Sequence, residues 1–172
     1  MDFVQLKKAN NSSLVVITVL GPQSTGKSTL LNHIFGAKFH VSDGRCTKGL
    51  NAMLVKTDIK DAEEVLILDS EGLFSIEKND KKKDRNMVVF CFAISNFVLI
   101  NMRGELDTAV QSILNEAISA SELISAHMSN EKLPVPIFVV RDQTAGYDEA
   151  AKVLEEQAKN IMHGLKKANK EN

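Results

Sequence analysis

The sequence predicts an α/β fold, with a mostly parallel β-sheet and helices on both of its faces. Short apolar runs alternate along the chain with helical patterns, and this alternation is typical of parallel strands joined by crossover helices. Most of the runs are almost entirely apolar, as in strands that helices cover on both faces. With 44% hydrophobic and 25% charged residues in a chain of 172, the composition is that of an ordinary globular protein. The length indicates one domain.

Five runs have the length and composition of strands. They are residues 14–20, 50–57, 64–68, 97–102 and 135–140. The run at 50–57 mixes polar and apolar residues, so we expect it at an edge of the sheet, and we expect the other four to be buried.

Four segments have helical patterns, at residues 27–35, 83–95, 107–128 and 147–168. Gly36 is a natural stop for the first, because glycine accepts the left-handed conformation that ends many helices. The second contains Phe90, Cys91 and Phe92, which we expect in the core. The third is the clearest, with apolar residues at three- and four-residue spacing. The end of the chain is polar and has no further strand pattern, so we expect a single domain over residues 1–172 that lacks its final strand and is cut short.

Charge and cysteine content exclude several classes of protein. The formal net charge is −1, so no overall basic field exists to hold nucleic acid. Two cysteines, Cys46 and Cys91, cannot make the disulfide framework of a small secreted domain. The longest apolar stretch, 87–102, is interrupted by polar residues and is shorter than the ~20 residues of a membrane span. We therefore expect a cytoplasmic protein without a nucleic-acid partner.

Residues 21–28 read Gly-Pro-Gln-Ser-Thr-Gly-Lys-Ser and match the phosphate-loop pattern G-x-x-x-x-G-K-[ST]. An apolar strand precedes the match and a helix follows it, and this context favours phosphate binding over a glycine turn that binds nothing. The two glycines let successive N–H groups face an anion, Lys27 offsets the charge of the β- and γ-phosphates, and the Ser28 hydroxyl is a candidate Mg²⁺ ligand. The residues expected to contact nucleotide here are Gly21, Gln23, Ser24, Thr25, Gly26, Lys27, Ser28 and Thr29.

A carboxylate and a threonine complete the predicted metal site. Asp69 follows an apolar strand and begins a D-x-x-G pattern that ends at Gly72. We expect Asp69 to orient Mg²⁺ and the Gly72 N–H to meet a γ-phosphate. Thr47, in the polar loop 36–49, is the candidate for the threonine that closes over Mg²⁺ in phosphate-loop GTPases. The alternatives are a strand-ending aspartate before a turn and an ordinary loop threonine.

Hydrolysis requires an unusual arrangement, because Leu73 stands where many GTPases have a water-orienting glutamine. Arg45 is the candidate for an internal arginine finger on the γ-phosphate, and a solvated loop arginine is an equal alternative. Glu71 is a weaker candidate for holding a water. With Thr47, these residues are the predicted catalytic set.

Arg141 and Asp142 follow the last predicted strand, where guanine-binding proteins carry N/T-K-x-D, a pattern that this chain lacks. A carboxylate at this place can accept hydrogen bonds from both N–H groups on the edge of guanine, which adenine does not offer. The Arg141 stem could lie against the plane of the base. The alternative is a surface ion pair at a strand end.

Together, these motifs resemble those of the guanylate-binding-protein and atlastin type within the dynamin-like GTPases. The resemblance spans about residues 15–142 and depends on Thr47-Lys48-Gly49, on Asp69-Ser70-Glu71-Gly72-Leu73 and on the Arg-Asp pair. The phosphate loop resembles those of the root-hair-defective type and of the very large interferon-inducible GTPases. Segments 44–49 and 101–105 look most like the second group.

The resemblance implies a phosphate-loop GTPase fold that binds and hydrolyses GTP with Mg²⁺ and pairs with a second copy across the nucleotide face. Any peripheral membrane association would come from regions outside this sequence. Two alternatives remain open. One is a guanine-nucleotide-binding module without hydrolysis, and the other is an ATP-using phosphate-loop enzyme.

Overall fold

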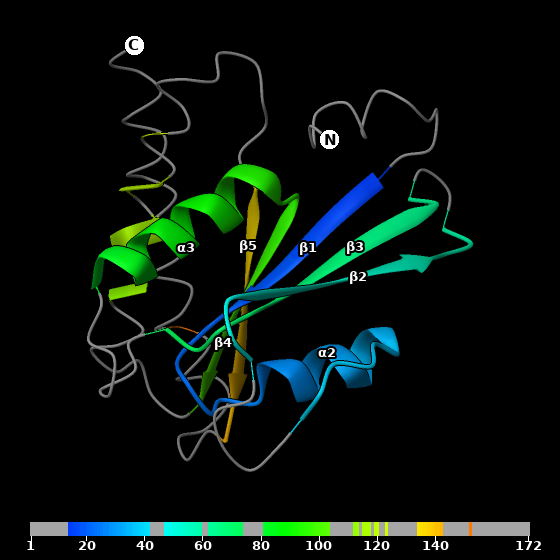
Figure 1. The fold of residues 1–172 in the computed structure, drawn as a ribbon, viewed down its shortest axis with the longest axis horizontal. Coiled ribbons are helices and arrows are strands. Elements are labelled where there is room, and N and C mark those ends of the chain that lie inside the picture. The colour runs from blue at the N-terminus through cyan, green and yellow to red at the C-terminus, as the bar shows by residue number, and fades with distance from the viewer. Residues whose placement is uncertain are drawn as a thin grey trace.

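The computed structural model describes residues 14–41, 47–59, 62–73, 81–103, 112–113, 115–117, 119–120, 123, 134–142 and 152. These residues form one five-stranded sheet with two complete helices (Figure 1). The elements, in chain order, are β1 (Leu14–Leu20), α2 (Lys27–Phe35), β2 (Leu50–Lys56), β3 (Glu64–Ser70), α3 (Lys81–Ile94), β4 (Phe97–Arg103) and β5 (Val135–Arg141).

The strand order is β2-β3-β1-β4-β5, and every neighbouring pair except one is parallel. The exception is β2, which runs antiparallel to β3. Strand β2 lies at one edge of the sheet, as the mixed composition of that run predicts. The predicted fold class is therefore confirmed. Because β1, β3, β4 and β5 all point the same way, their carboxyl ends meet at one edge, where open α/β sheets bind ligands.

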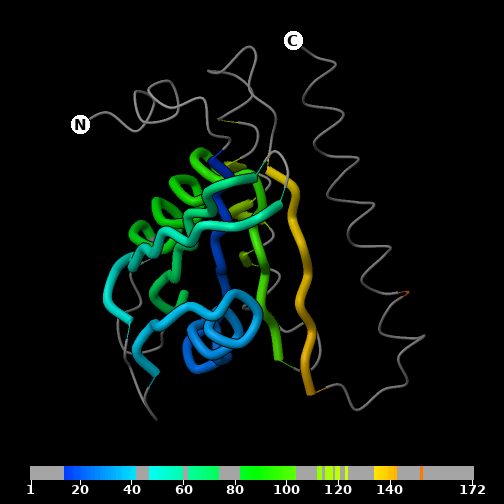
Figure 2. The backbone as a smooth tube through the Cα atoms, turned by 90° about the vertical axis from the view of Figure 1, so that its right-hand side faces the viewer, coloured from blue at the N-terminus to red at the C-terminus, as the bar shows by residue number. Residues whose placement is uncertain are grey.

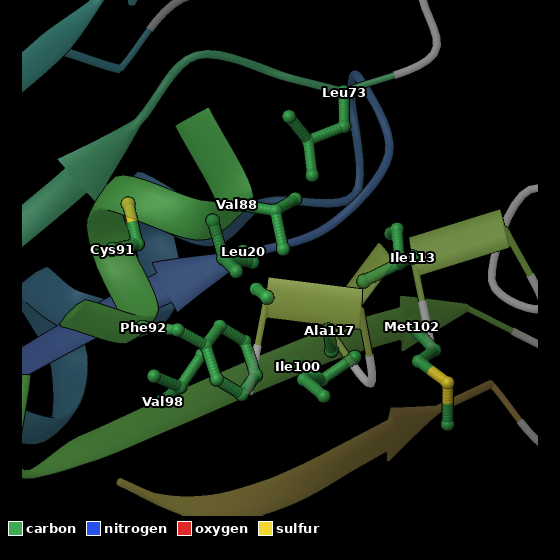
Figure 3. Packing of buried hydrophobic residues seen from close by; sticks show 11 residues of the cluster. Leu20, Leu73, Val88, Cys91, Phe92, Val98, Ile100, Met102, Ile113 and Ala117 are labelled. Atoms are coloured by element: carbon green, nitrogen blue, oxygen red, sulfur yellow. The ribbon is translucent and has the colours of Figure 1, made fainter. Parts of the chain in front are cut away.

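Two hydrophobic clusters fill the two faces of the sheet, and each belongs to a different helix (Figure 1). On one face, Val88, Cys91 and Phe92 of α3 pack on β4 together with Ile113 and Ala117 (Figure 3). The other face is covered by α2 through its buried residue Leu31. This two-sided burial explains why β1, β3 and β4 each contain a run of at least four consecutive apolar residues.

Helix α2 has the predicted bounds and ends at Gly36, whose φ of 62° lies in the left-handed region. Helix α3 begins two residues earlier than predicted, at Lys81, and ends at Ile94. Cys91 and Phe92 are buried as expected, but Phe90 is 50% exposed. The core prediction for Phe90 is wrong because residues 90 and 92 lie about 200° apart around a helix and cannot both face the sheet.

Strand β5 departs from the prediction of a buried strand. Its Val135 and Ile137 are 51% and 42% exposed. The described part of the chain places β5 beside β4 and gives it no second strand neighbour, so it is an edge strand there (Figure 2). The predicted helix at 107–128 is described only at scattered helical positions, and the one at 147–168 lies outside the described residues except for Lys152. None of the described helices has the length and hydrophobicity to cross a membrane.

Candidate functional site

The phosphate loop connects the carboxyl end of the central strand β1 to the first turn of α2 (Figure 1). Gly26 precedes the helix with a φ of 74°, and Ser24 also has a positive φ, of 60°. The Leu30 N–H donates to the Gly26 carbonyl at 2.9 Å, so the helix starts directly from the loop. A backbone that turns in this way before a helix N-terminus directs N–H groups and the positive end of the helix dipole toward one point.

Lys27 is buried, with 7% of its surface exposed. Its ammonium donates to the carbonyls of Gly21 and Pro22 at 3.2 and 2.9 Å. Burial lowers the pKa of Lys27 from 10.5 to about 8, and the nearby carboxylate of Asp69 partly opposes this change. An ammonium has three N–H donors, so two bonds to the loop leave one for an anion. A buried cation whose pKa is lowered by burial is typical of a functional site.

Two predicted metal-site hydroxyls, those of Ser28 and Thr47, converge on one carboxylate oxygen of the third, Asp69. The Ser28 hydroxyl donates to Asp69 Oδ2 at 2.6 Å, and the Thr47 hydroxyl donates to the same oxygen at 3.1 Å. The two hydroxyl oxygens are 3.3 Å apart. Burial raises the pKa of Asp69, against the effect of these hydrogen bonds and of Lys27. Residues from α2, β3 and the segment before β2 thus meet around one buried carboxylate, although up to 41 residues separate them in sequence.

The end of the D-x-x-G pattern is packed directly on the phosphate loop. The Leu73 N–H donates to the Gly21 carbonyl at 3.1 Å, and Pro22 and Leu73 form an isolated parallel bridge. A Cβ atom on Gly72 would lie 2.4 Å from the Cα of Gln23. Only glycine fits this approach, because side-chain carbons do not come so close to backbone atoms. The backbone of Gly72 therefore lies next to the phosphate loop, and the predicted contact of its N–H with a γ-phosphate stays a prediction.

Glu71 links three segments around the site. Its Oε2 accepts hydrogen bonds from the Gly49 N–H at 3.0 Å and from the Lys83 ammonium at 2.9 Å, while the Glu71 N–H donates to the Gly49 carbonyl at 2.7 Å. With 8% of its surface exposed, Glu71 is a buried connector between β3, the start of β2 and α3. The predicted role in holding a water stays a prediction, and the structure adds a structural role that the sequence did not suggest.

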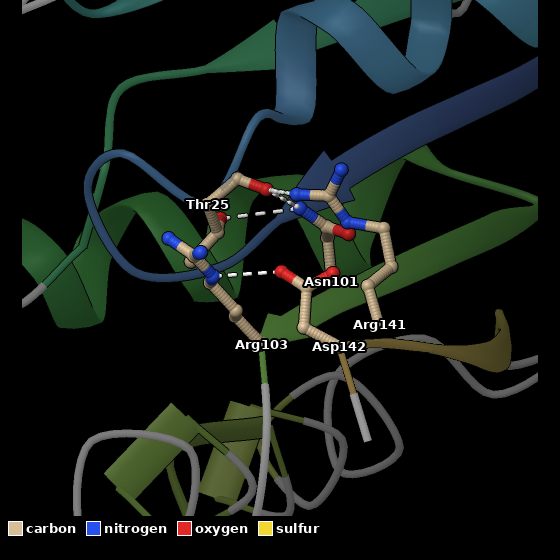
Figure 4. A network of polar contacts seen from close by, with 5 residues as sticks. All are labelled: Thr25, Asn101, Arg103, Arg141 and Asp142. Atoms are coloured by element: carbon tan, nitrogen blue, oxygen red, sulfur yellow. Dashed lines mark hydrogen bonds and ion pairs between the residues drawn. The ribbon is translucent and has the colours of Figure 1, made fainter. Parts of the chain in front are cut away.

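The predicted Arg-Asp pair lies at the end of β5, where Arg141 is the last residue of the strand and contacts the phosphate loop (Figure 4). Arg141 donates from Nη2 to the Thr25 carbonyl. Asp142 has a φ of 54° and accepts from Arg103 Nε at 2.7 Å, in a pair whose side chains are 60% and 67% exposed. A non-glycine residue in the left-handed region is uncommon and often marks a functional position. The contacts with Thr25 and Arg103 were not foreseen from the sequence.

Asn101 also belongs to the site, although no sequence motif assigns it a role there. It lies on β4 with no exposed surface, and its amide Nδ2 donates to the carbonyl and the hydroxyl oxygen of Thr25 at 2.8 and 3.1 Å. The sequence does contain a signal for it, which is an asparagine within the apolar run at 97–102. A polar side chain in a buried strand needs hydrogen-bond partners.

For the other predicted site residues, the structure gives less information about their contacts. Ser24 and Thr29 are exposed, and Arg45 lies outside the described residues. Within the described segments, no three His, Cys, Asp or Glu side chains form a metal-binding group.

A family model described as the URGCP-like GTPase domain matches residues 1–165. The chain belongs to this family. It is therefore a GTPase domain, which favours GTP over the ATP-using alternative. The predicted resemblance to large GTPases is confirmed at the level of the family.

The relatives of this URGCP-like GTPase domain include two groups that the sequence motifs suggested. Interferon-induced very large GTPase 1 of Mus musculus is 41% identical over 121 residues, which are 66% of this chain and 5% of that protein. A SEY1 homolog of Giardia intestinalis is 41% identical over 100 residues, 54% of this chain and 10% of that protein. The chain thus spans a small fraction of the relatives that it matches.

Two solved structures show the same fold at low identity. Toc33 from Arabidopsis thaliana, in a dimerization-deficient mutant, matches 98% of this chain and 68% of its own with a TM-score of 0.58 and 13% identity. Era, solved with MgGDPNP and a segment of 16S ribosomal RNA, matches 87% of this chain and 48% of its own, also with a TM-score of 0.58, at 16% identity.

Proposed function

We propose that this URGCP-like GTPase domain binds GTP together with Mg²⁺ at the loop between β1 and α2 and hydrolyses its γ-phosphate. The observation that carries the proposal is the convergence of Ser28 and Thr47 on Asp69 Oδ2, beside the buried ammonium of Lys27. A cation, two hydroxyls and a carboxylate around one helix N-terminus match the chemistry of a metal–triphosphate complex.

The donor set fits Mg²⁺. Asp69 Oδ1 is buried and has no hydrogen-bond partner among the described residues, so the carboxylate keeps an oxygen that a hard cation can satisfy. The hydroxyls of Ser28 and Thr47 supply two more oxygens. Bound there, Mg²⁺ would offset charge on the β- and γ-phosphate oxygens. Era, a fold neighbour, was solved with MgGDPNP, which supports this assignment.

Hydrolysis joins a water oxygen to the γ-phosphorus and breaks the bond to the β–γ bridging oxygen, so negative charge moves toward the β-phosphate. Lys27 and the backbone N–H groups of the phosphate loop are placed to balance this charge. The Gly72 N–H, held against the loop by the Leu73–Gly21 hydrogen bond, is the candidate donor to the γ-phosphate. We propose Arg45 as the source of additional charge, because the chain has no glutamine after Gly72 and no arginine in the phosphate loop.

Guanine recognition is assigned to Asp142. Its carboxylate is exposed at the end of β5 and is held by one hydrogen bond from Arg103 to Oδ2. A carboxylate has about four acceptor positions, so the edge of guanine can bind without displacing Arg103. The left-handed backbone of Asp142 supports this role, since such conformations concentrate at binding sites.

We further propose that two copies of the domain pair across the nucleotide face. The resemblance to guanylate-binding proteins and atlastins supports this, as does the fold neighbour Toc33, whose mutant is described as dimerization deficient. A cytoplasmic location, predicted from the cysteine content, remains part of the proposal.

The decisive experiment is competition of GTP and ATP for one fluorescent guanine nucleotide, with Mg²⁺ and with EDTA. We expect GTP to compete well, ATP poorly, and binding to weaken without Mg²⁺. Lys27→Ala should abolish binding, whereas Lys38→Ala, which removes an exposed lysine after the same helix, should not. Equal binding by the Lys27 and Lys38 variants would refute the site.

Single-turnover hydrolysis then separates an enzyme from a binding module. Wild-type protein mixed in excess with labelled GTP should release phosphate in one exponential phase, and Lys27→Ala should release none. Tight GTP binding without phosphate release would favour the non-hydrolysing alternative.

A further inference from the structure

The feature that the proposed function leaves unexplained is a buried asparagine in the middle of the apolar sheet. Asn101 has no exposed surface, and its backbone oxygen lies against the start of the phosphate loop, 2.3 Å from where a Cβ on Gly21 would be. Its Oδ1 is buried without a hydrogen-bond partner among the described residues. Burying an unpaired oxygen lowers the stability of the folded chain, and an apolar side chain at this position of β4 would avoid that loss. We therefore expect the amide to have a role through the contacts of its Nδ2 group.

That role is visible at Thr25, which lies within the phosphate loop (Figure 4). Asn101 Nδ2 donates to the Thr25 carbonyl at 2.8 Å and to its hydroxyl oxygen at 3.1 Å. Arg141 donates from Nη2 to the same carbonyl. A carbonyl oxygen has two lone pairs, so these two side chains saturate it. Turning the amide of Asn101 over would put Oδ1 against the Thr25 carbonyl, which fixes the amide in this orientation.

The direction of the Thr25 carbonyl also determines the direction of the Gly26 N–H. The Thr25 carbonyl and the Gly26 N–H belong to one planar trans peptide, in which the two groups point in opposite directions. With the carbonyl turned toward β4 and β5, the Gly26 N–H must point away from the sheet. Gly26 adjoins Lys27 and the first turn of α2, where the phosphates are proposed to bind.

We propose that Asn101 is a positioning residue that, together with Arg141, locks the Thr25–Gly26 peptide so that the Gly26 N–H is preset to donate to a phosphate. The proposal rests on the proposed nucleotide site but is independent of metal binding and of base recognition. The side chains of the sheet would then hold the phosphate loop in its binding conformation before the nucleotide arrives. An unsupported glycine-rich loop would have to become ordered on binding, at a cost in conformational entropy.

The test is Asn101→Ala in the 172-residue chain, with Thr18→Val as the matched control. Thr18 is also fully buried in the sheet, and its hydroxyl is 2.6 Å from that of Ser95, so the control loses a buried hydrogen bond away from the loop. We expect Asn101→Ala to weaken GTP and GDP binding by similar factors, roughly three- to tenfold, with the preference for GTP over ATP unchanged. Thr18→Val should bind both nucleotides as the wild type does. Wild-type affinity in Asn101→Ala, or an equal loss in Thr18→Val, overturns the proposal.

A spectroscopic measurement reports the locked peptide directly. Of the 9 glycines, only Gly26 follows a threonine, so ¹³C-carbonyl threonine combined with ¹⁵N-glycine gives a single amide signal. In the wild type, adding GDP with Mg²⁺ should move this signal strongly downfield, as a hydrogen bond to phosphate does. In Asn101→Ala, the movement should be smaller at saturating GDP. An unchanged movement overturns the proposal.

Two further variants keep the test informative if Asn101→Ala does not fold. Asn101→Asp preserves volume and replaces the donor with an acceptor, and we expect it to weaken GDP binding at least as much. Arg141→Met removes the second donor from the partly exposed end of β5 and should reduce the movement of the Gly26 signal. A full movement in Arg141→Met overturns the proposal.

The controls also separate this proposal from the proposed function. If Lys27→Ala binds GTP as the wild type does, the nucleotide site itself is wrong. If Lys27→Ala loses binding and Asn101→Ala does not, only the positioning role of Asn101 fails.

Discussion

Changing pH should move the stability of the domain and its affinity for GTP in opposite directions, because both depend on the ammonium of Lys27. Burial lowers the pKa of this group to about 8, from 10.5 in the unfolded chain. Between these two values the unfolded chain binds a proton that the folded chain has lost. The folded state therefore gains stability as the pH rises through this window.

The magnitude follows from the two pKa values. Their difference of about 2.5, at ~1.36 kcal/mol for each unit, amounts to about 3 kcal/mol over the whole window. About 2 kcal/mol of this should appear between pH 7.5 and 9.5. Binding has the opposite sign, because only the protonated group carries the charge that phosphate requires. From pH 7 to 9 the protonated fraction of Lys27 falls roughly tenfold, and affinity should fall with it.

The assay is urea unfolding of wild type and Lys27→Met at several pH values, with calorimetric titration of GDP and Mg²⁺ in parallel. Subtracting the two unfolding free energies removes the groups that titrate alike in both proteins. We expect the difference to rise in favour of the wild type by about 2 kcal/mol from pH 7.5 to 9.5. A flat difference would show that Lys27 keeps an ordinary pKa and that its burial has been overestimated.

Further predictions concern the other site residues. Ser28→Ala should weaken GTP binding strongly with Mg²⁺ present and little in EDTA; equal losses would argue against a metal ligand. Asp142→Asn should lower GTP affinity roughly ten- to a hundredfold and favour xanthosine triphosphate in competition, because a polar group that is mispaired once the base covers it costs about 1–3 kcal/mol. Arg45→Ala should slow single-turnover hydrolysis by about 10³-fold or more while leaving GTP binding nearly intact; a loss of neither would identify a solvated arginine. Gly72→Ala should abolish hydrolysis, since its Cβ would lie 2.4 Å from Gln23 Cα, and normal turnover would contradict this close packing.

The sequence predicted the fold because its strongest signals are local. Apolar runs of strand length and three- and four-residue spacing of apolar side chains depend on near neighbours alone. The phosphate loop is also local, since eight consecutive residues between a strand and a helix specify it. Helix α2 and strand β1 accordingly have the predicted bounds.

The errors lie where distant segments decide the outcome. Phe90 was assigned to the core from its composition, but the side of α3 that faces the sheet depends on how the helix docks. Val135 and Ile137 are apolar and yet exposed, because burial of β5 depends on what lies beside it. The periodicity of α3 excludes that Phe90 and Phe92 both face the sheet, but which of them does so, and what covers β5, cannot be obtained from one segment.

The candidate site divides in the same way. The sequence alone predicts Lys27, Ser28, Asp69 and Asp142 as site residues, since each belongs to a motif with a known chemical purpose. Only the tertiary structure showed that Asn101 and Arg141, from two neighbouring strands, meet at one carbonyl of the phosphate loop. Thr25 and Arg141 are 116 positions apart in the sequence. Parallel strands bring the ends of distant segments together at one edge of the sheet. The hydrogen bonds to the Thr25 carbonyl depend on this arrangement in space, and the spacing of the residues along the chain does not reveal them.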